Sequence, residues 1–465
     1  MIAVARFLWM SLLVLVPLTI RTPESGLVGT GRVASYLWTD GLLALVVLLV
    51  LLDELMSPRR ASNQPRAGRT VLVMFVVLFE VQYVSLLAAM ARGDAMSVSY
   101  LGAGVVWLRA LAVFVVARRL VRDPSDVQRL WRAFLVAYVV VCGISLLELA
   151  RNAQVTAILN TYYGTTVHQE AMRHLADIGQ YRVTATFDRN PHGLALYMMI
   201  GIAVITSVLA NVRGMRVPSR LALFVLVGVG VTVLLVTSSV LALLGTVAAV
   251  ASIAVARRRH RIRGGVVLGG LLVGAGFIAA TWLRTTIARV ATTIGALRTG
   301  DLSSIALLSF TDRLDVWLQA VALMEKTALA LVFGVGPAVL VRAVRDTGMY
   351  ADNDYLFVLF ATGALGLLAF LALLTACLIE IQKRLRVCPA QGPGLALVIA
   401  SRGALLGLAV AAFAGPFFTS EAFWRDSFML WTLLGVVCAS GAVGSPIPAP
   451  TGAAALQGTT GATDA

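Results

Sequence analysis

Apolar segments of about 20 residues recur along the whole chain, and each is long enough to cross the roughly 30 Å hydrocarbon core of a bilayer as a helix. Hydrophobic residues make up 59% of the 465 residues, and charged residues make up 13%. A soluble chain carries about 25% charged residues. Because lipid cannot hydrogen-bond a backbone, segments that cross it form helices. The sequence therefore predicts an all-α, polytopic membrane bundle.

We expect about twelve transmembrane helices, which form a single domain over residues 1–444. The first segment also resembles a signal peptide, but no convincing small-residue cleavage site follows it, so we expect a retained helix. Residues 445–465 are rich in Pro, Gly, Ala and Thr, which predicts a disordered tail. The expected spans are 5–20, 36–52, 70–90, 98–117, 132–149, 193–211, 219–236, 240–256, 264–282, 355–379, 396–414 and 427–444.

The distribution of arginine predicts how the bundle is oriented. Short loops rich in Lys and Arg stay in the cytoplasm. Alternate loops carry clusters of basic residues, such as the one at 257–263, whereas the short loops between them carry few. This pattern predicts cytoplasmic termini and a cytoplasmic tail. It places two long loops, 150–192 and 283–354, together on the extracytoplasmic face.

Several classes of function are not expected. The net charge is +15, but the basic residues are split among short loops, so we expect no nucleic-acid partner. The four cysteines form no C-x-x-C pair, so neither a zinc site nor a disulfide framework is indicated. We expect no metal and no cofactor. No ATP-binding motif is present, so chemistry on the outer face requires a substrate that carries its own activation.

Three polar runs, at 181–195, 309–317 and 352–355, each lie at the mouth of an apolar segment on the predicted outer face. Two of them carry arginines whose heads we expect near the membrane surface, and a guanidinium there suits bidentate capture of a phosphate. The alternative is that these arginines are solvated charges balanced by nearby carboxylates. The arginines concerned are Arg189 and Arg313.

Two further residues at the helix mouths are candidates for acid–base chemistry. His192 follows a proline at a helix start, where backbone N–H groups favour an anion. It can act as a base, or it can be a polar side chain that reaches the membrane surface. Asp352 also precedes a helix. It can accept a proton from an incoming hydroxyl, or it can serve only to cap the helix and complement its dipole.

Two charges fall at mid-depth in consecutive spans. Glu80 lies in the third span and Arg109 in the fourth. Charged residues in a membrane are costly and are usually paired or functional. We therefore predict that Glu80 and Arg109 form a buried intramembrane salt bridge.

The order and spacing of these motifs, over about residues 181–380, resemble the O-antigen ligase and O-antigen polymerase superfamily. The matching elements are Arg-x-x-x-x-Phe with Asn-Pro-His-Gly-Leu-Ala at 182–195, Asp-Arg-Leu-Asp-Val-Trp at 312–317, Gly-Val-Gly-Pro at 334–337, and Asp-Asn-Asp-Tyr-Leu with Gly-Ala-Leu-Gly at 352–366. Members of this superfamily are similar to type C glycosyltransferases. The resemblance implies a bacterial inner-membrane protein with a large extracytoplasmic loop between helices nine and ten.

The resemblance also implies an activity. Such enzymes move a glycan from an undecaprenyl-diphosphate carrier to an acceptor hydroxyl, without a nucleotide sugar and without a metal. It implies that Arg182 or Arg189, together with Arg313, holds the diphosphate, while Asp352 or His192 activates the acceptor. The expected partners are the lipid-linked glycan donor, a saccharide acceptor, the lipid bilayer and a chain-length regulator.

Two departures from the superfamily pattern favour one branch of it. The Ser-Arg-Gly common at the start of the eighth span is replaced by Ser-Val-Leu at 239–241, and Asp352 stands where ligases commonly carry histidine. These departures favour a polymerase of O-antigen or exopolysaccharide over a ligase that completes lipopolysaccharide on lipid A-core. A transporter or flippase is the rival class, but it requires mid-depth charges on several helices. A purely structural partner leaves the arginine-bearing loops unexplained.

Overall fold

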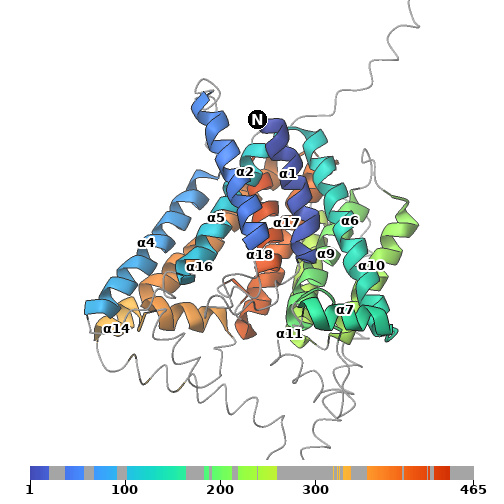
Figure 1. Ribbon diagram of the computed structural model, residues 1–465. Helices are drawn as coiled ribbons and strands as arrows, with labels where there is room; N and C mark the ends of the chain where they lie inside the picture. The colour runs from blue at the N-terminus through green and yellow to red at the C-terminus, as the bar shows by residue number, and fades with distance from the viewer. Residues whose placement is uncertain are drawn as a thin grey trace, which may run out of the picture.

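The computed structural model is all-helical in the part of the chain that it describes, with no strand among those residues (Figure 1). The described residues are 1–19, 37–56, 68–91, 102–163, 183–187, 191–211, 218–237, 239–258, 318, 322, 324, 328–336, 353–389, 392–415, 417–418 and 424–439.

The helices follow the apolar pattern of the sequence. Their bounds are α1 (Ile2–Leu15) with the 3₁₀ turn η1 (Val16–Leu18), α2 (Leu37–Met56), α4 (Arg69–Ala91), α5 (Gly102–Leu120), α6 (Pro124–Leu149), α7 (Ala153–Tyr163), α9 (Pro191–Ala210), α10 (Arg220–Val236), α11 (Val240–Arg258), α14 (Ala328–Phe333), α16 (Asp354–Val387), α17 (Pro393–Ala411) with the 3₁₀ turn η4 (Ala412–Ala414), and α18 (Trp424–Val437).

Five of the described helices, α4, α6, α9, α16 and α17, are long and apolar enough to cross a membrane. The prediction of an all-helical membrane protein is confirmed at this level. Shorter apolar helices occupy several other predicted spans, and the predicted span at 264–282 lies outside the described residues. The total of twelve spans stays a prediction.

The helices run roughly side by side between two ends, and the contacts define which elements share an end (Figure 1). At the N-terminal end, Arg6 Nε donates to Leu120 O at 3.0 Å and joins the start of α1 to the end of α5. Arg119 and Glu54 pair there at 2.8 Å, which adds the end of α2. This end therefore holds arginines of the predicted cytoplasmic loops.

The opposite end, called here the loop end, holds η1, α7, residues 183–187 and the starts of α9 and α16. Thr186 Oγ1 donates to Pro17 O at 2.6 Å, and Tyr163 O–H donates to Leu18 O at 2.9 Å. In Figure 1 the N-terminus of α1 lies at the top, and α7 crosses the bottom of the bundle. The described parts of both long loops therefore meet at one end, opposite the start of the chain.

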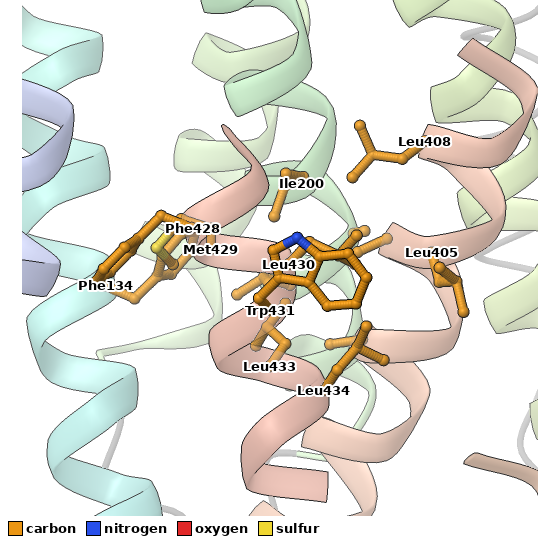
Figure 2. Close-up of a cluster of buried hydrophobic side chains, with 14 of the residues drawn as sticks. Phe134, Ile200, Leu405, Leu408, Phe428, Met429, Leu430, Trp431, Leu433 and Leu434 are labelled. Atoms are coloured by element: carbon orange, nitrogen blue, oxygen red, sulfur yellow. The ribbon is translucent and has the colours of Figure 1, made fainter. Parts of the chain in front are cut away.

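The core of the bundle lies between α9, α17 and α18, and the first two are buried along most of their length. Trp431 is 1% exposed and packs against Phe75 with ring centroids 4.8 Å apart. Figure 2 shows this part of the core, in which side chains of α18 face those of α17, α9 and α6. The labelled residues are Phe134, Ile200, Leu405, Leu408, Phe428, Met429, Leu430, Trp431, Leu433 and Leu434.

Glycine allows α11 and α17 to pack with their backbones almost in contact. A Cβ at Gly245 would lie 2.6 Å from Gly407 O, and a Cβ at Gly407 would lie 2.8 Å from Gly245 O. Gly403, one turn earlier in α17, faces Ile253 in the same interface. In lipid, helices associate through close van der Waals contact rather than through the hydrophobic effect, so small residues are the means of attachment.

We predict that Gly245→Ala destabilises the protein by about 1–3 kcal/mol, because the added methyl group forces α11 away from α17. Gly228 in α10 is the matched control, since a Cβ there meets nothing within 4 Å. Gly228→Ala should be neutral or stabilise by up to about 1 kcal/mol, as Gly→Ala does in an open helix. The thermal unfolding midpoints of the detergent-solubilised variants measure both. Equal midpoints would contradict the close packing of α11 and α17.

We predict that a cysteine at Ser303, in the second long loop, reacts with a membrane-impermeant thiol reagent in intact cells. A cysteine at Ser125, exposed at the N-terminal end, should react only after lysis. Background labelling should be low because all four native cysteines are buried and burial raises the pKa of Cys388 to about 11. The reverse labelling pattern would mean that the bundle is inserted the other way.

Candidate functional site

The candidate site is the loop end, where the described parts of two of the three polar runs are attached to the bundle. His192 is among the described residues. Arg182, Arg189, Arg313 and Asp352 lie outside the described residues. Their convergence on one cavity is therefore still a prediction. What the structure describes is how the residues beside three of them are fixed.

The first polar run is attached through Glu148, a buried carboxylate in the last turn of α6 that is 1% exposed. Glu148 accepts hydrogen bonds from Thr184 N at 2.9 Å, Ala185 N at 2.7 Å and Thr184 Oγ1 at 3.1 Å. Hydrogen bonds to an ionised acceptor are about twice as strong as neutral ones. Glu148 therefore fixes residues 183–187, the segment that lies between Arg182 and Arg189.

The backbone of this segment is bent so that two successive N–H groups face one carboxylate oxygen. Ala185 has a φ of 44°, in the left-handed region that L-residues seldom occupy. Successive N–H groups that converge in this way form an anion-binding concavity, here occupied by Glu148. The sequence interpretation missed Glu148, because a single carboxylate at the end of an apolar span has no distinguishing pattern.

His192 is the second residue of α9, and its Nδ1 lies 3.1 Å from the hydroxyl of Ser239, the residue directly before α11. Ser239 is 1% exposed, whereas the histidine is half-buried. The two residues are 47 positions apart in sequence and meet because α9 packs against α11. His192 is thus an oriented side chain at a helix start, and Ser239 is a site residue that sequence reasoning did not identify.

The third polar run is attached at the start of α16. Asn353 caps the helix by accepting from Leu356 N at 3.1 Å, and its Nδ2 donates to Phe413 O at 2.8 Å. The fully buried Asp354 accepts from Phe418 N at 2.8 Å. Asn353 is thus the residue that caps α16, and the role of the neighbouring Asp352 stays a prediction.

Gly363 interrupts α16 with a φ of 70°, so residues 354–362 and 364–387 are two helical parts. The carbonyls freed by the break accept from the glycine turn after α14: Val335 N donates to Phe360 O at 2.8 Å, and Gly336 N donates to Ala361 O at 3.1 Å. In Figure 1, α14 lies beside α16 at the lower end of the bundle. The Gly-Val-Gly-Pro motif is therefore the partner of a broken helix.

Ser85, buried in α4, closes this junction. Its hydroxyl lies within hydrogen-bond distance of both Phe333 O, at the end of α14, and Ala361 O. Because a hydroxyl has a single hydrogen, the two carbonyl oxygens share one donor. Gly363 and Gly334 are both required here. A Cβ at Gly363 would lie 2.2 Å from Val332 O, and a Cβ at Gly334 would lie 2.5 Å from Ala361 O.

The predicted salt bridge between Glu80 and Arg109 is wrong, because Arg109 Nη2 donates to Asp40 Oδ2. Asp40 lies in the first turn of α2, and α2 packs against α5 as α4 does. Glu80 lies on the exposed side of α4 and pairs with none of the described residues. Glu80 and Arg109 lie in consecutive helices, but the Arg109 side chain points toward α2, whereas Glu80 is exposed. Arg402, near the middle of α17, is a further intramembrane charge that the sequence interpretation did not count.

The described residues contain no cluster of three His, Cys, Asp or Glu side chains that could hold a metal ion. No protein-family model matches the chain, and no curated protein matches it. The resemblance to O-antigen ligases and polymerases therefore stays a prediction based on motifs.

We predict that Glu148→Ala releases residues 183–187, because two buried N–H groups then lose their acceptor at about 1–3 kcal/mol each. Glu148→Gln is the matched control. Its amide oxygen can accept from both N–H groups, while the Thr184 hydroxyl turns to accept from the amide nitrogen. Hydrogen–deuterium exchange of the peptide that contains Thr184 and Ala185 should speed up in the alanine variant and change little in the glutamine variant. Unchanged exchange in both variants would contradict the anchoring role.

Proposed function

We propose that this chain is a membrane glycosyltransferase that transfers or polymerises undecaprenyl-diphosphate-linked oligosaccharide on the extracytoplasmic face of a bacterial inner membrane. Its product is O-antigen or exopolysaccharide. The observation that supports the proposal best is that Glu148 and Asp354 attach the first and third polar runs to the same end of the bundle. The segments that carry the predicted donor-binding and acceptor-activating residues thus both begin from fixed positions there.

Fixed positions matter for this chemistry because the leaving diphosphate concentrates negative charge. Hydrogen-bond donors of the protein that are already oriented toward that charge stabilise the transition state without reorganisation. In the proposed reaction, Arg182 or Arg189 binds the diphosphate together with Arg313. A planar guanidinium fork gives each arginine two parallel hydrogen bonds to phosphate oxygens.

The proposed transfer is a single displacement. The acceptor hydroxyl gives its proton to a base, Asp352 or His192, and its oxygen attacks the anomeric carbon of the donor. The bond from that carbon to the diphosphate oxygen breaks, and undecaprenyl diphosphate leaves with the electron pair. The configuration of the anomeric carbon is inverted. The site opens sideways to lipid, since each CH₂ of the carrier tail exposed to water costs about 0.8 kcal/mol.

Ligation to lipid A-core uses the same chemistry with another acceptor and is the nearest alternative. Two observations favour a transporter or flippase. The first is the interruption of α16 at Gly363, because broken helices form the substrate sites of many transporters. The second is that Glu80 and Arg402 place charges within α4 and α17. However, Phe360 O and Ala361 O at this break already accept hydrogen bonds from Val335 and Gly336. The intramembrane charge of Arg109 is balanced by Asp40. We therefore favour transfer over transport.

The proposal is tested with the purified protein in lipid nanodiscs supplied with an undecaprenyl-diphosphate-linked oligosaccharide from its source cells. We expect longer glycans on gels and free undecaprenyl diphosphate by mass spectrometry. Arg313→Lys should lower the rate about tenfold or more, which corresponds to about 1.4 kcal/mol of transition-state stabilisation, because lysine keeps the charge and loses the planar fork. Arg298→Lys, in the same loop, is the matched control and should leave the rate unchanged.

Two outcomes would count against the proposal. If the wild-type protein extends no glycan but moves the lipid-linked oligosaccharide across a vesicle membrane, the chain is a transporter. If Asp352→Asn leaves glycan extension unchanged, Asp352 is only part of the helix cap and is not the base.

A further inference from the structure

The contact between His192 and Ser239 links the protonation of the two ring nitrogens of the histidine to the direction of one hydrogen bond. Nδ1 and the Ser239 hydroxyl oxygen are 3.1 Å apart, within hydrogen-bond distance. In a neutral imidazole one nitrogen donates and the other accepts. The partner of Nδ1 therefore fixes the role of Nε2.

The burial of Ser239 decides the direction of this hydrogen bond. The residue is 1% exposed, so water does not satisfy its hydroxyl. Among the described residues, His192 Nδ1 is the hydrogen-bond partner of that hydroxyl. If Nδ1 donated to the serine, the hydroxyl hydrogen would be left buried without an acceptor, which is unfavourable. If the serine donates to Nδ1, both groups are satisfied.

The position of the pair at two helix starts favours a neutral ring. His192 lies in the first turn of α9, and Ser239 immediately precedes α11. Helix N-termini carry partial positive charge, which opposes protonation of an imidazole. A neutral ring that accepts at Nδ1 carries its proton at Nε2.

We propose that Ser239 is a positioning residue that holds His192 in the Nε2–H tautomer, so that His192 acts as a hydrogen-bond donor and not as the general base. This role rests on the proposed function. In that reaction His192 keeps its proton throughout and donates from Nε2 to an oxygen of the leaving diphosphate. The acceptor's proton then goes to another base, for which Asp352 is the remaining candidate from the sequence.

The tautomer can be measured without any assay of glycan transfer. The full-length protein is labelled with ¹⁵N in its histidine rings and reconstituted in lipid for solid-state NMR. The chain contains four histidines, and the His192→Gln spectrum identifies the His192 signals by subtraction. We expect a hydrogen-bonded, unprotonated Nδ1 and a protonated Nε2 at neutral pH. A protonated Nδ1, in either a neutral or a charged ring, would overturn the assignment.

The role in transfer is tested with two amide replacements. The side-chain nitrogen of glutamine can reach the position of Nε2, whereas the shorter asparagine side chain reaches only that of Nδ1. We expect His192→Gln to keep most of the wild-type kcat and His192→Asn to lose about tenfold or more, which is at least 1.4 kcal/mol. If both variants are equally inactive, an amide nitrogen at the position of Nε2 does not replace the imidazole, and the proposed donor role is wrong.

Ser239→Ala gives a second, independent readout. It should lower kcat with little change in the donor's KM, as expected for an interaction made mainly in the transition state. Ser239→Thr keeps the hydroxyl and should restore both kcat and the Nδ1 signal. If Ser239→Ala keeps the wild-type kcat, Ser239 does not position His192. If the wild-type protein transfers no glycan, the role of His192 is overturned with the proposed function, while the nitrogen signals still decide the tautomer.

Discussion

Backbone N–H and C=O groups that lose their helical partners must be satisfied within a protein that lies in lipid, and the loop end is arranged around this requirement. Glu148 accepts from the backbone of residues 183–187, and Asp354 accepts from Phe418 N. The carbonyls freed at Gly363 accept from Val335 and Gly336. Three places at this end, the end of α6, the start of α16 and the break at Gly363, are thus joined to other segments by hydrogen bonds.

This arrangement separates two uses of polar side chains. Three buried side chains at the loop end serve the backbone: Glu148, Asp354 and Ser85. Among the residues proposed to meet the substrate, Arg182 directly precedes the segment that Glu148 holds, and Asp352 lies two residues before Asp354. Such a division is physically reasonable, because an anchor must stay desolvated and fully bonded, whereas a substrate-binding group must exchange its partners during each reaction.

The sequence predicted the helices and the helix cap, which depend on local pattern. It failed to predict side-chain partners that come from distant segments of the chain. The apolar runs predicted most helices, and the polar residues before α16 predicted its cap, which Asn353 provides. The partner of Arg109 was mispredicted because the prediction paired it with Glu80 of α4, the helix directly before α5. The partner in the structure is Asp40 of α2. Glu148 and Ser239 were missed because each acts through a tertiary contact 36 or 47 residues away. The arginines of the proposed site are still known only from the sequence.

The glycine contact between α11 and α17 has a consequence beyond stability, because it also sets how far along its axis α11 lies. Gly245 is six residues after Ser239, about 9 Å along the helix at 1.5 Å per residue, and a Cβ on it would also touch Met199 of α9. A slide of α11 by a single residue would move the serine hydroxyl by about 1.5 Å and break its 3.1 Å contact with His192. The close glycine contact between α11 and α17 therefore controls how the side chains of Ser239 and His192 are aligned at the loop end.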